Sequence, residues 1–323
     1  MAVPVLLFLL GFILLIKGGD WFVDGAVAIA HRFKLPELLI GATIVSIGTT
    51  LPEVMVSTNA AALGNSGISY GNAIGSIICN TSLIAAVTIA IKPSKVNKSA
   101  LTLPVFSFFA VAILYSLFAY VNRGFSRWNG ILFLALFVAY MLVTYYQVKK
   151  HPEYAEDDEE NKESKYTKTW QQILLLVIGA AAIAVGARLL VNNGTLIAKA
   201  LGVPDSVIGL TMVALGTSLP ELITAITSLI KGHSSLSVGN IVGANIFNIV
   251  LVSGMSITIS PFALPSEKMI SGINSSLMID IPVMFAVMMI MCLPAVIRGK
   301  LERWQGITLL VIYTAFTVYQ FVS

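Results

Sequence analysis

Residues 41–53 read GATIVSIGTTLPE, and residues 209–221 read GLTMVALGTSLPE. Eight of the 13 positions are identical. The separation of Glu53 from Glu221, called here the repeat interval, also separates Gly71 from Gly239, so the duplication extends over whole segments of the chain. Each copy places one glutamate beside a Gly/Thr/Pro break within apolar sequence. A matched pair of such carboxylates is typical of a cation site inside a membrane.

The composition indicates an integral membrane protein. Mean hydropathy is +0.87, with 57% hydrophobic and 11% charged residues over 323 positions, which lies outside the range of soluble domains. Many apolar runs are long enough to cross about 30 Å of hydrocarbon as helices of roughly 20 residues. The predicted fold class is therefore an all-α integral membrane protein. It has ten predicted transmembrane helices: 3–29, 36–63, 69–91, 101–121, 127–148, 170–199, 205–230, 236–260, 271–296 and 303–322.

The ten predicted spans form two halves of five. Because five is odd, the second half starts on the opposite membrane face, and the two repeats are inverted. Three regions follow from this division: a first repeat with its motif at 41–80, an acidic linker, and a second inverted repeat with its motif at 209–248. Their bounds are 1–148, 149–169 and 170–323.

The placement of basic residues predicts the orientation. If the amino terminus lies outside, the turns that face the cytoplasm hold 14 of the 20 Lys and Arg residues. We therefore expect a multi-pass protein of the cell (inner) membrane, with both termini outside and the 149–169 linker cytoplasmic. The net charge of +4 comes from these turns and gives no argument for a nucleic-acid partner. The expected surroundings are the lipid bilayer, and the sequence implies no obligatory protein partner.

The two glutamates need compensation, because an ionised carboxylate within a membrane costs about 2.5–3.5 kcal/mol or more. Bound metal cations supply it most simply, since hard cations prefer carboxylate, hydroxyl and carbonyl oxygens. Pro52 and Pro220 should bend their helices and free main-chain carbonyls one turn earlier. The alternative is a pair of protonated glutamates beside a kink. Hydroxyl groups flank each glutamate, at Thr49, Thr50, Thr217 and Ser218.

A second pair of segments, GNAIGSIICN at 71–80 and GNIVGANIFN at 239–248, follows the first pair. Their small residues are common packing chemistry between membrane helices. Their amides are not required for packing, so we assign them as ligands or as residues that support the ligands. These site-lining candidates are Asn72, Asn80, Asn240, Asn245 and Asn248.

With these motifs the chain resembles the sodium/calcium exchangers of the calcium/cation antiporter superfamily, in particular their prokaryotic ten-helix branch. The resemblance covers nearly the whole chain and implies exchange of sodium for calcium by alternating access, with calcium and sodium as transported ions and no cofactor. It implies calcium ligands at Glu53, Glu221, Thr49 and Thr217. It implies sodium ligands at Ser46, Thr50, Ser76, Ala214 and Ser218 together with both glutamates.

The chain departs from the family pattern at Ala244 and Asn248, where some members have serine and aspartate. The hydroxyl lost at Ala244 weakens one sodium site. The amide at Asn248 leaves two acids in the site, which match one calcium ion or two sodium ions and disfavour potassium coupling.

Three other functions compete with sodium/calcium exchange. A calcium/proton or other cation antiporter of the same fold remains the main alternative. A channel is disfavoured because no selectivity-filter sequence is present. An enzyme is not expected: GNSG at 64–67 matches a nucleophile motif superficially, but the histidines lie in predicted turns or in the linker. Asp20 is expected to pair with Lys17 three residues earlier.

Overall fold

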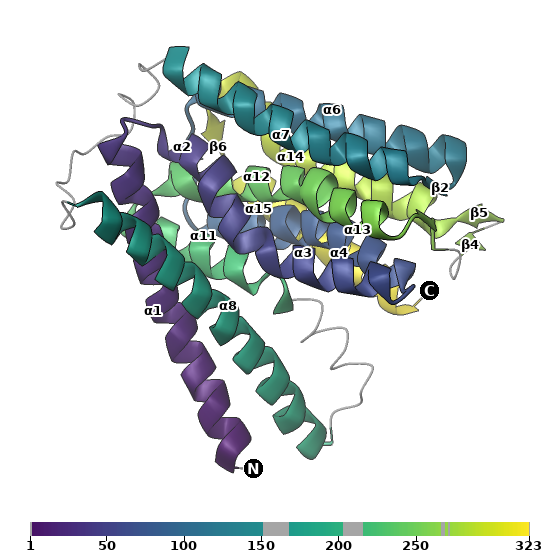
Figure 1. The fold of residues 1–323 in the computed structure, drawn as a ribbon, viewed down its shortest axis with the longest axis horizontal. Helices are drawn as coiled ribbons and strands as arrows, with labels where there is room; N and C mark the ends of the chain where they lie inside the picture. Colours follow the sequence, from purple (N-terminus) through teal and green to yellow (C-terminus); the bar gives the residue numbers. More distant parts are fainter. Residues whose placement is uncertain (1, 151–167, 203–215, 266–268, 271, 323) are drawn as a thin grey trace.

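The structure, a computed structural model, describes residues 2–150, 168–202, 216–265, 269–270 and 272–322. The first half contains five long helical segments, some of them interrupted by short π-helical stretches (Figure 1). Their elements are α1 (Ala2–Arg32), α2 (Glu37–Ile40), η1 (Gly41–Val45), α3 (Ser46–Ala62), α4 (Ser66–Cys79), η2 (Asn80–Ala85), α5 (Ala86–Ile91), α6 (Lys98–Asn122) and α7 (Arg127–Lys150).

The second half repeats this order. Its helical elements are α8 (Thr169–Ala200), α11 (Leu219–Lys231), α12 (Ser234–Phe247), η5 (Asn248–Ser253), α13 (Gly254–Ile259), η6 (Ser276–Asp280), α14 (Ile281–Arg298) and α15 (Arg303–Val322). Short strands join some of them: β1 (Ser94–Lys95), β2 (Gly124–Phe125), β3 (Phe262–Ala263), β4 (Met269–Ile270), β5 (Ile273–Asn274) and β6 (Lys300–Leu301).

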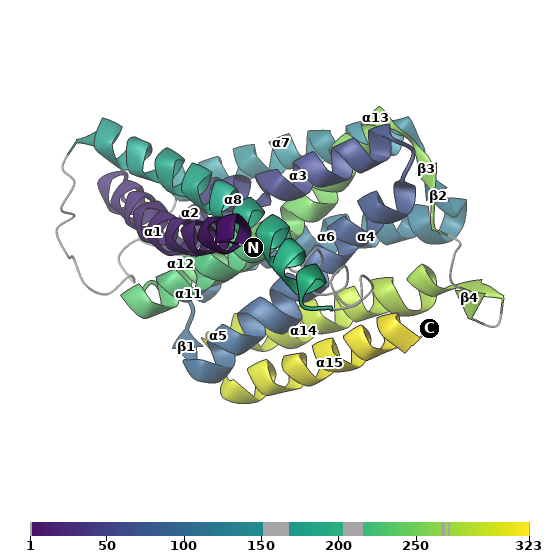
Figure 2. The same cartoon turned by 90° about the horizontal axis from the view of Figure 1, so that it is seen from below.

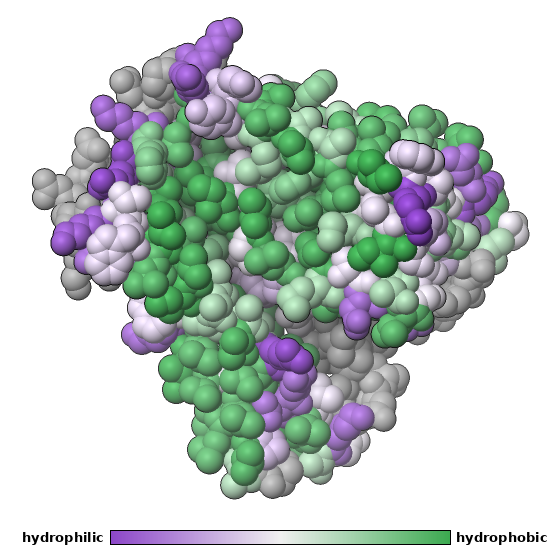
Figure 3. Space-filling model, viewed as in Figure 1, coloured by the Kyte–Doolittle hydropathy of each residue, from purple (hydrophilic) through white to green (hydrophobic). Residues whose placement is uncertain are grey.

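The helices have the length and surface of membrane spans. Within the described residues, eight helices are long and apolar enough to cross a bilayer. Of the other two predicted spans, 303–322 is observed as α15, and residues 219–230 of the span 205–230 lie in α11. Figure 3 shows a broad apolar surface, with hydrophilic groups at its left and right ends and a smaller hydrophilic strip in its lower part. The predicted all-α membrane fold is confirmed, while the acidic stretch 151–167 lies outside the described residues.

The repeat interval found in the sequence is reproduced in the coordinates. The helix from Ser66 to Ile91 has its counterpart from Ser234 to Ile259, and both ends are displaced by that same interval. Each changes to π-helix at an asparagine, Asn80 or Asn248. A π-helical stretch within an α-helix is rare and is found mostly at functional sites. The two asparagines therefore occupy equivalent, locally distorted positions.

The strand pairs show that the repeats are inverted. β1 pairs with β6, and β2 pairs with β3. The repeat interval relates β1 to β3, and β2 and β6 occupy matching positions before α7 and α15. The repeat therefore relates the β1–β6 pair to the β2–β3 pair. These two strand pairs lie at opposite ends of the molecule (Figures 1 and 2).

The interval is not constant to the end of the chain. α7 begins at Arg127 and α15 begins at Arg303, which are farther apart in sequence than the repeat interval. The extra residues fall between β3 and η6, where β4 and β5 form a small antiparallel hairpin. This insertion moves the start of the ninth helical segment to Ser276, later than the predicted 271.

Two long helices, α1 and α8, cross the rest of the bundle together (Figure 1). They run antiparallel, because Gly11 meets Gly186 whereas Gly18 meets Gly179. A Cβ atom at Gly11 or Gly186 would lie 2.8 Å from the carbonyl oxygen of the other glycine. Glycine at these positions therefore allows backbone-to-backbone contact between the helices.

The remaining helices surround the two motif-bearing segments. Buried side chains of α4, α6, α7, α12 and α14 form the larger hydrophobic cluster, which includes Phe108, Phe133 and Phe247. Local sequence sets the helix ends. Asn97 caps α6 by accepting a hydrogen bond from the Ala100 amide at 3.0 Å, and Gly232 ends α11 with φ of 91°.

Candidate cation site

The two proline-glutamate segments adopt different backbone conformations. In the first repeat, α3 continues through Pro52 as a helix. In the second repeat, Thr217 and Ser218 form a turn, and α11 begins at Leu219 with Pro220 in its first turn. Pro52 therefore lies inside its helix, whereas Pro220 lies at the start of its helix. Glu221 consequently lies in the first turn of a helix, where the helix dipole favours a negative charge.

Glu53 on α3 and Glu221 on α11 both lie in the interior. Both side chains are fully buried, at 0% exposure. They are close enough for their charges to repel each other. None of their four carboxylate oxygens has a hydrogen-bond partner in the described part of the chain. Burying an ionised group without a partner costs several kcal/mol, so the arrangement requires a cation or protons between the two repeats.

Further oxygen atoms surround this pair. Thr50 and Ser218 occupy equivalent positions in the two repeats, and both hydroxyl oxygens are buried without a partner among the described residues. Thr49 lies beside the Glu221 carboxylate. No group of three or more His, Cys, Asp or Glu residues forms a metal cluster in the part of the chain that the structure describes. A cation at the glutamates would therefore complete its coordination with neutral hydroxyl, amide and carbonyl oxygens, which suits hard cations.

Two hydrogen bonds connect the repeats symmetrically. The Thr49 hydroxyl donates to Asn240 Oδ1 at 3.1 Å, and the Thr217 hydroxyl donates to Asn72 Oδ1 at 3.2 Å. The repeat interval relates one pair to the other. Because each threonine gives its proton to an amide oxygen, the lone pairs of its hydroxyl oxygen can face the glutamates. Asn72 and Asn240 thus position the threonines.

The π-helical segments η2 and η5 pack against the helices that carry the two glutamates. η2, which begins at Asn80, packs against the glutamate helix α11, and η5, which begins at Asn248, packs against the glutamate helix α3. Asn80 and Asn248 are both 0% exposed. Asn80 Oδ1 and both polar atoms of the Asn248 amide have no hydrogen-bond partner within the described residues. These two amides therefore have oxygen atoms available to a cation.

The other sequence candidates are placed as follows. Ser46 is fully buried, and its hydroxyl donates to the Gly41 carbonyl at 2.7 Å and contacts the Asn240 carbonyl at 3.0 Å. Ser76 is buried on α4. Ala214 lies outside the described residues.

Asn245 is buried and directs its amide nitrogen to Thr81 and Met288, two residues that sequence reasoning did not select. The position equivalent to Asn245 in the first repeat is Ile77, which is apolar. The repeat pattern therefore gave no signal for the partners of Asn245.

Packing around the site is tight toward the α11–α12 turn. On the side of the α11–α12 turn, Gly239 packs against the Leu38 carbonyl, and Gly243 packs against Ala42. The repeat interval relates Leu38 and Ala42 to Ser206 and Leu210, which lie outside the described residues. The site is therefore closed toward the α11–α12 turn.

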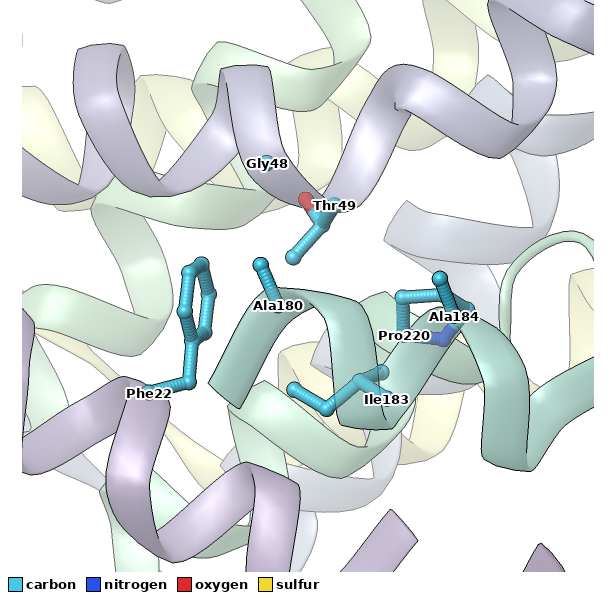
Figure 4. Close-up of a pocket in the computed structure, with 7 residues that line it drawn as sticks. All are labelled: Phe22, Gly48, Thr49, Ala180, Ile183, Ala184 and Pro220. Atoms are coloured by element: carbon cyan, nitrogen blue, oxygen red, sulfur yellow. The ribbon is translucent and has the colours of Figure 1, made fainter. Parts of the chain in front are cut away.

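The long helices seal the site laterally. A crevice between α1 and α8 on one side and α3 and α11 on the other ends at Thr49 and Pro220 (Figure 4). It has no room for a water molecule. The Phe22 ring lies against Gly48, where a Cβ atom would be 3.0 Å from the ring. Movement of α1 and α8 would therefore change access to Thr49.

Charged groups reinforce the closed side. Lys231 Nζ, at the end of α11, lies 2.7 Å from Asp24 and 3.4 Å from Asp20 on α1. The expected partner of Asp20, Lys17, is not the one that the structure records. Nearby, Glu37 Oε1 lies 2.8 Å from His233 Nδ1 and 3.5 Å from His31 Nε2. These contacts join the α11–α12 turn to α1 and α2.

Comparisons with known proteins agree with this architecture. The family description "Sodium/calcium exchanger protein" matches residues 3–146 and 171–322. The chain is 33% identical to the sodium/calcium exchanger MaX1 of Methanosarcina acetivorans, over 99% of each protein. It is 32% identical to the inner membrane protein YrbG of Escherichia coli, over 89% of each.

A solved structure gives the same result. The sodium-calcium exchanger NCX_Mj, soaked with 2.5 mM Na+ and 10 mM Sr2+, superimposes with a TM-score of 0.80 at 33% identity, over 97% of each chain. The family match covers both repeats, including the two glutamate segments. The chain belongs to the sodium/calcium exchanger protein family.

Proposed function

We propose that this protein is a secondary active antiporter that exchanges sodium for calcium at the site between Glu53 and Glu221. The observation that carries the proposal is the pair of fully buried carboxylates, one from each inverted repeat, with no hydrogen-bond partner among the described residues. Two negative charges balance one calcium ion or two sodium ions. The names of the relatives MaX1 and NCX_Mj, both called exchangers of sodium and calcium, support the choice of ions.

The calcium ligands in this proposal are both glutamates together with Thr49 and Thr217. Sodium would use the same glutamates and the neighbouring hydroxyl and carbonyl oxygens of Ser46, Thr50, Ser76, Ala214 and Ser218. Because the two sets share the glutamates, the ions compete, and binding of one displaces the other. The site emptied of cations would hold two uncompensated charges, which disfavours a change of access without cargo. Competition therefore gives exchange instead of leak.

The closed side of the site supports alternating access. With both termini outside, the α3–α4 turn faces outward and the α11–α12 turn faces the cytoplasm. The tight packing at Gly239 and Gly243 then corresponds to an arrangement that is closed toward the cytoplasm. An inverted repeat provides the opposite arrangement when the two halves exchange conformations. Antiparallel α1 and α8 are placed to move between these arrangements because together they contact both glutamate helices.

The test is calcium flux in vesicles with sodium, potassium and proton gradients imposed separately. We expect an outward-directed sodium gradient to drive calcium uptake with no requirement for potassium. Uptake driven by a pH gradient and indifferent to sodium would favour the calcium/proton antiporter and contradict this assignment. An absolute potassium requirement would show that the amide at Asn248 does not set the coupling ion.

A further inference from the structure

A chain of hydrogen bonds behind the cation site contains Asn245, Thr81 and Asn80. Asn245 Nδ2 donates to Thr81 Oγ1 at 2.7 Å and to Met288 Sδ at 3.2 Å. On the other side of the same amide, Asn245 Oδ1 accepts a hydrogen bond from Asn80 Nδ2 at 3.3 Å. Thr81, Asn245 and Met288 are all fully buried, so solvent does not compete for these contacts.

The direction of this chain is fixed by its far end. The Thr81 hydroxyl has two acceptors for its proton besides Asn245, the Ile77 carbonyl at 2.8 Å and Met288 Sδ at 3.2 Å. With its proton on either of them, the hydroxyl oxygen accepts from Asn245, and the thioether sulfur also accepts. This end of the Asn245 amide therefore needs the NH2 group. A flipped amide would face Met288 Sδ with an oxygen atom and lose the donor to both acceptors.

The orientation of Asn245 in turn sets that of Asn80. Asn245 presents Oδ1 to Asn80, so the Asn80 amide turns its own NH2 group toward Asn245. Asn80 Oδ1 then faces away from Asn245, buried and without a partner among the described residues. An amide that turned the other way would present two positive N–H groups to a cation.

Asn248, the counterpart of Asn80, has no equivalent chain of hydrogen bonds among the described residues. The positions equivalent to Asn245 and Thr81 are Ile77 and Ile249, which cannot orient an amide. Accordingly, both polar atoms of Asn248 are without partners in the described chain. The two equivalent asparagines thus differ in what holds them, although both are fully buried.

We propose that Asn245 is a positioning residue that makes Asn80 an oxygen ligand for the transported cation. The inference rests on the proposed cation site and adds one residue that does not touch the ion. Asn245 acts only through the orientation of the Asn80 amide. Replacement of Asn80 by aspartate removes the need for Asn245, because both terminal atoms of aspartate are oxygens.

The experiment is a double-mutant cycle in proteoliposomes. The half-saturating calcium concentration and the maximal rate of sodium-driven uptake are measured for wild type, Asn245→Leu, Asn80→Asp and the double variant. We expect Asn245→Leu to raise the half-saturating calcium concentration about tenfold in the wild-type background. This is the usual scale for one lost hydrogen-bonding group. In the Asn80→Asp background we expect less than about a twofold effect. Equal effects in both backgrounds would show that Asn245 is merely structural and would overturn the proposal.

Thr81 provides a second test that keeps packing nearly constant. Thr81→Val is close in volume but removes the acceptor that holds the Asn245 amide, so calcium affinity should fall in the same direction as in Asn245→Leu. Thr81→Ser keeps the hydroxyl and should retain wild-type affinity. A loss of calcium affinity in both Thr81 variants, or in neither, would contradict the role of this chain of hydrogen bonds. These variants also decide the question if Asn245→Leu does not fold.

A control separates this inference from the proposed function. Glu53→Gln should abolish calcium binding in the same preparation. If Glu53→Gln binds calcium normally, the cation site itself is wrongly placed. If Glu53→Gln loses binding and the Asn245 effects are equal in both backgrounds, only the positioning role is wrong.

Discussion

Replacement of Gly239 by alanine tests whether tight packing on the α11–α12 side defines one access state. The added Cβ atom would overlap the Leu38 carbonyl oxygen, a backbone atom that cannot rotate away. Overpacking of this kind costs about 1–3 kcal/mol. The helix-propensity gain from glycine to alanine, about 1 kcal/mol, applies to both access states and cancels. The equilibrium should therefore move roughly 5- to 150-fold away from the observed arrangement.

The assay is the half-saturating calcium concentration for transport, measured separately at each membrane face. Apparent affinity at one face scales with the fraction of protein open to it, so the ratio of the two concentrations changes by the same factor as the equilibrium. For Gly239→Ala, we expect the concentration at the α3–α4 face to rise relative to that at the other face.

The equivalent glycine provides the matched control. Gly71→Ala adds the same atom at the position that the repeat interval relates to Gly239, in the other repeat. Its strain should instead appear in the opposite arrangement, and the ratio should change in the opposite direction. If both active variants shift the ratio the same way, or neither shifts it, the link between glycine packing and access is refuted.

Three other perturbations have defined outcomes. Lys231→Met removes the half-exposed ion pair with Asp24, which is worth about 0.5–1 kcal/mol after solvent screening. The ratio of the two half-saturating calcium concentrations should therefore change about two- to fivefold, in the same direction as for Gly239→Ala. An unchanged ratio would show that the ion pair does not favour one access state. Asn248→Asp should add a third carboxylate, so calcium flux should become sensitive to pH or potassium, and an unchanged response to both would contradict this. Gly18→Leu should force α1 away from Gly179 and cost about 1–3 kcal/mol or more, seen as a lower melting temperature in detergent; an unchanged melting temperature would show that the close contact is dispensable.

The duplicated motif was sufficient to predict the fold and the burial of both glutamates. A constant repeat interval with an odd number of spans requires inverted repeats, and inverted repeats bring equivalent positions together. The structure accordingly places Glu53 and Glu221 within range of each other's charge. Apolar length then predicted most helix ends within a few residues.

The duplicated motif did not predict the differences between the two repeats. The β4–β5 hairpin lengthens one connection, and insertions in surface connections leave no periodic signal. Pro52 and Pro220 have the same sequence context, yet the first lies inside its helix and the second lies at the start of its helix. The role proposed for Asn245 depends on a contact with Met288, which lies on a different helix and belongs to no motif.

The central claim is that the two glutamates bind one shared cation, and equilibrium binding of radioactive calcium to the purified protein tests it most directly. Wild type should bind calcium in competition with sodium. Glu53→Gln and Glu221→Gln should each lose that binding, while both variants keep the wild-type elution profile in size-exclusion chromatography. Undiminished calcium binding by either folded variant would contradict the account.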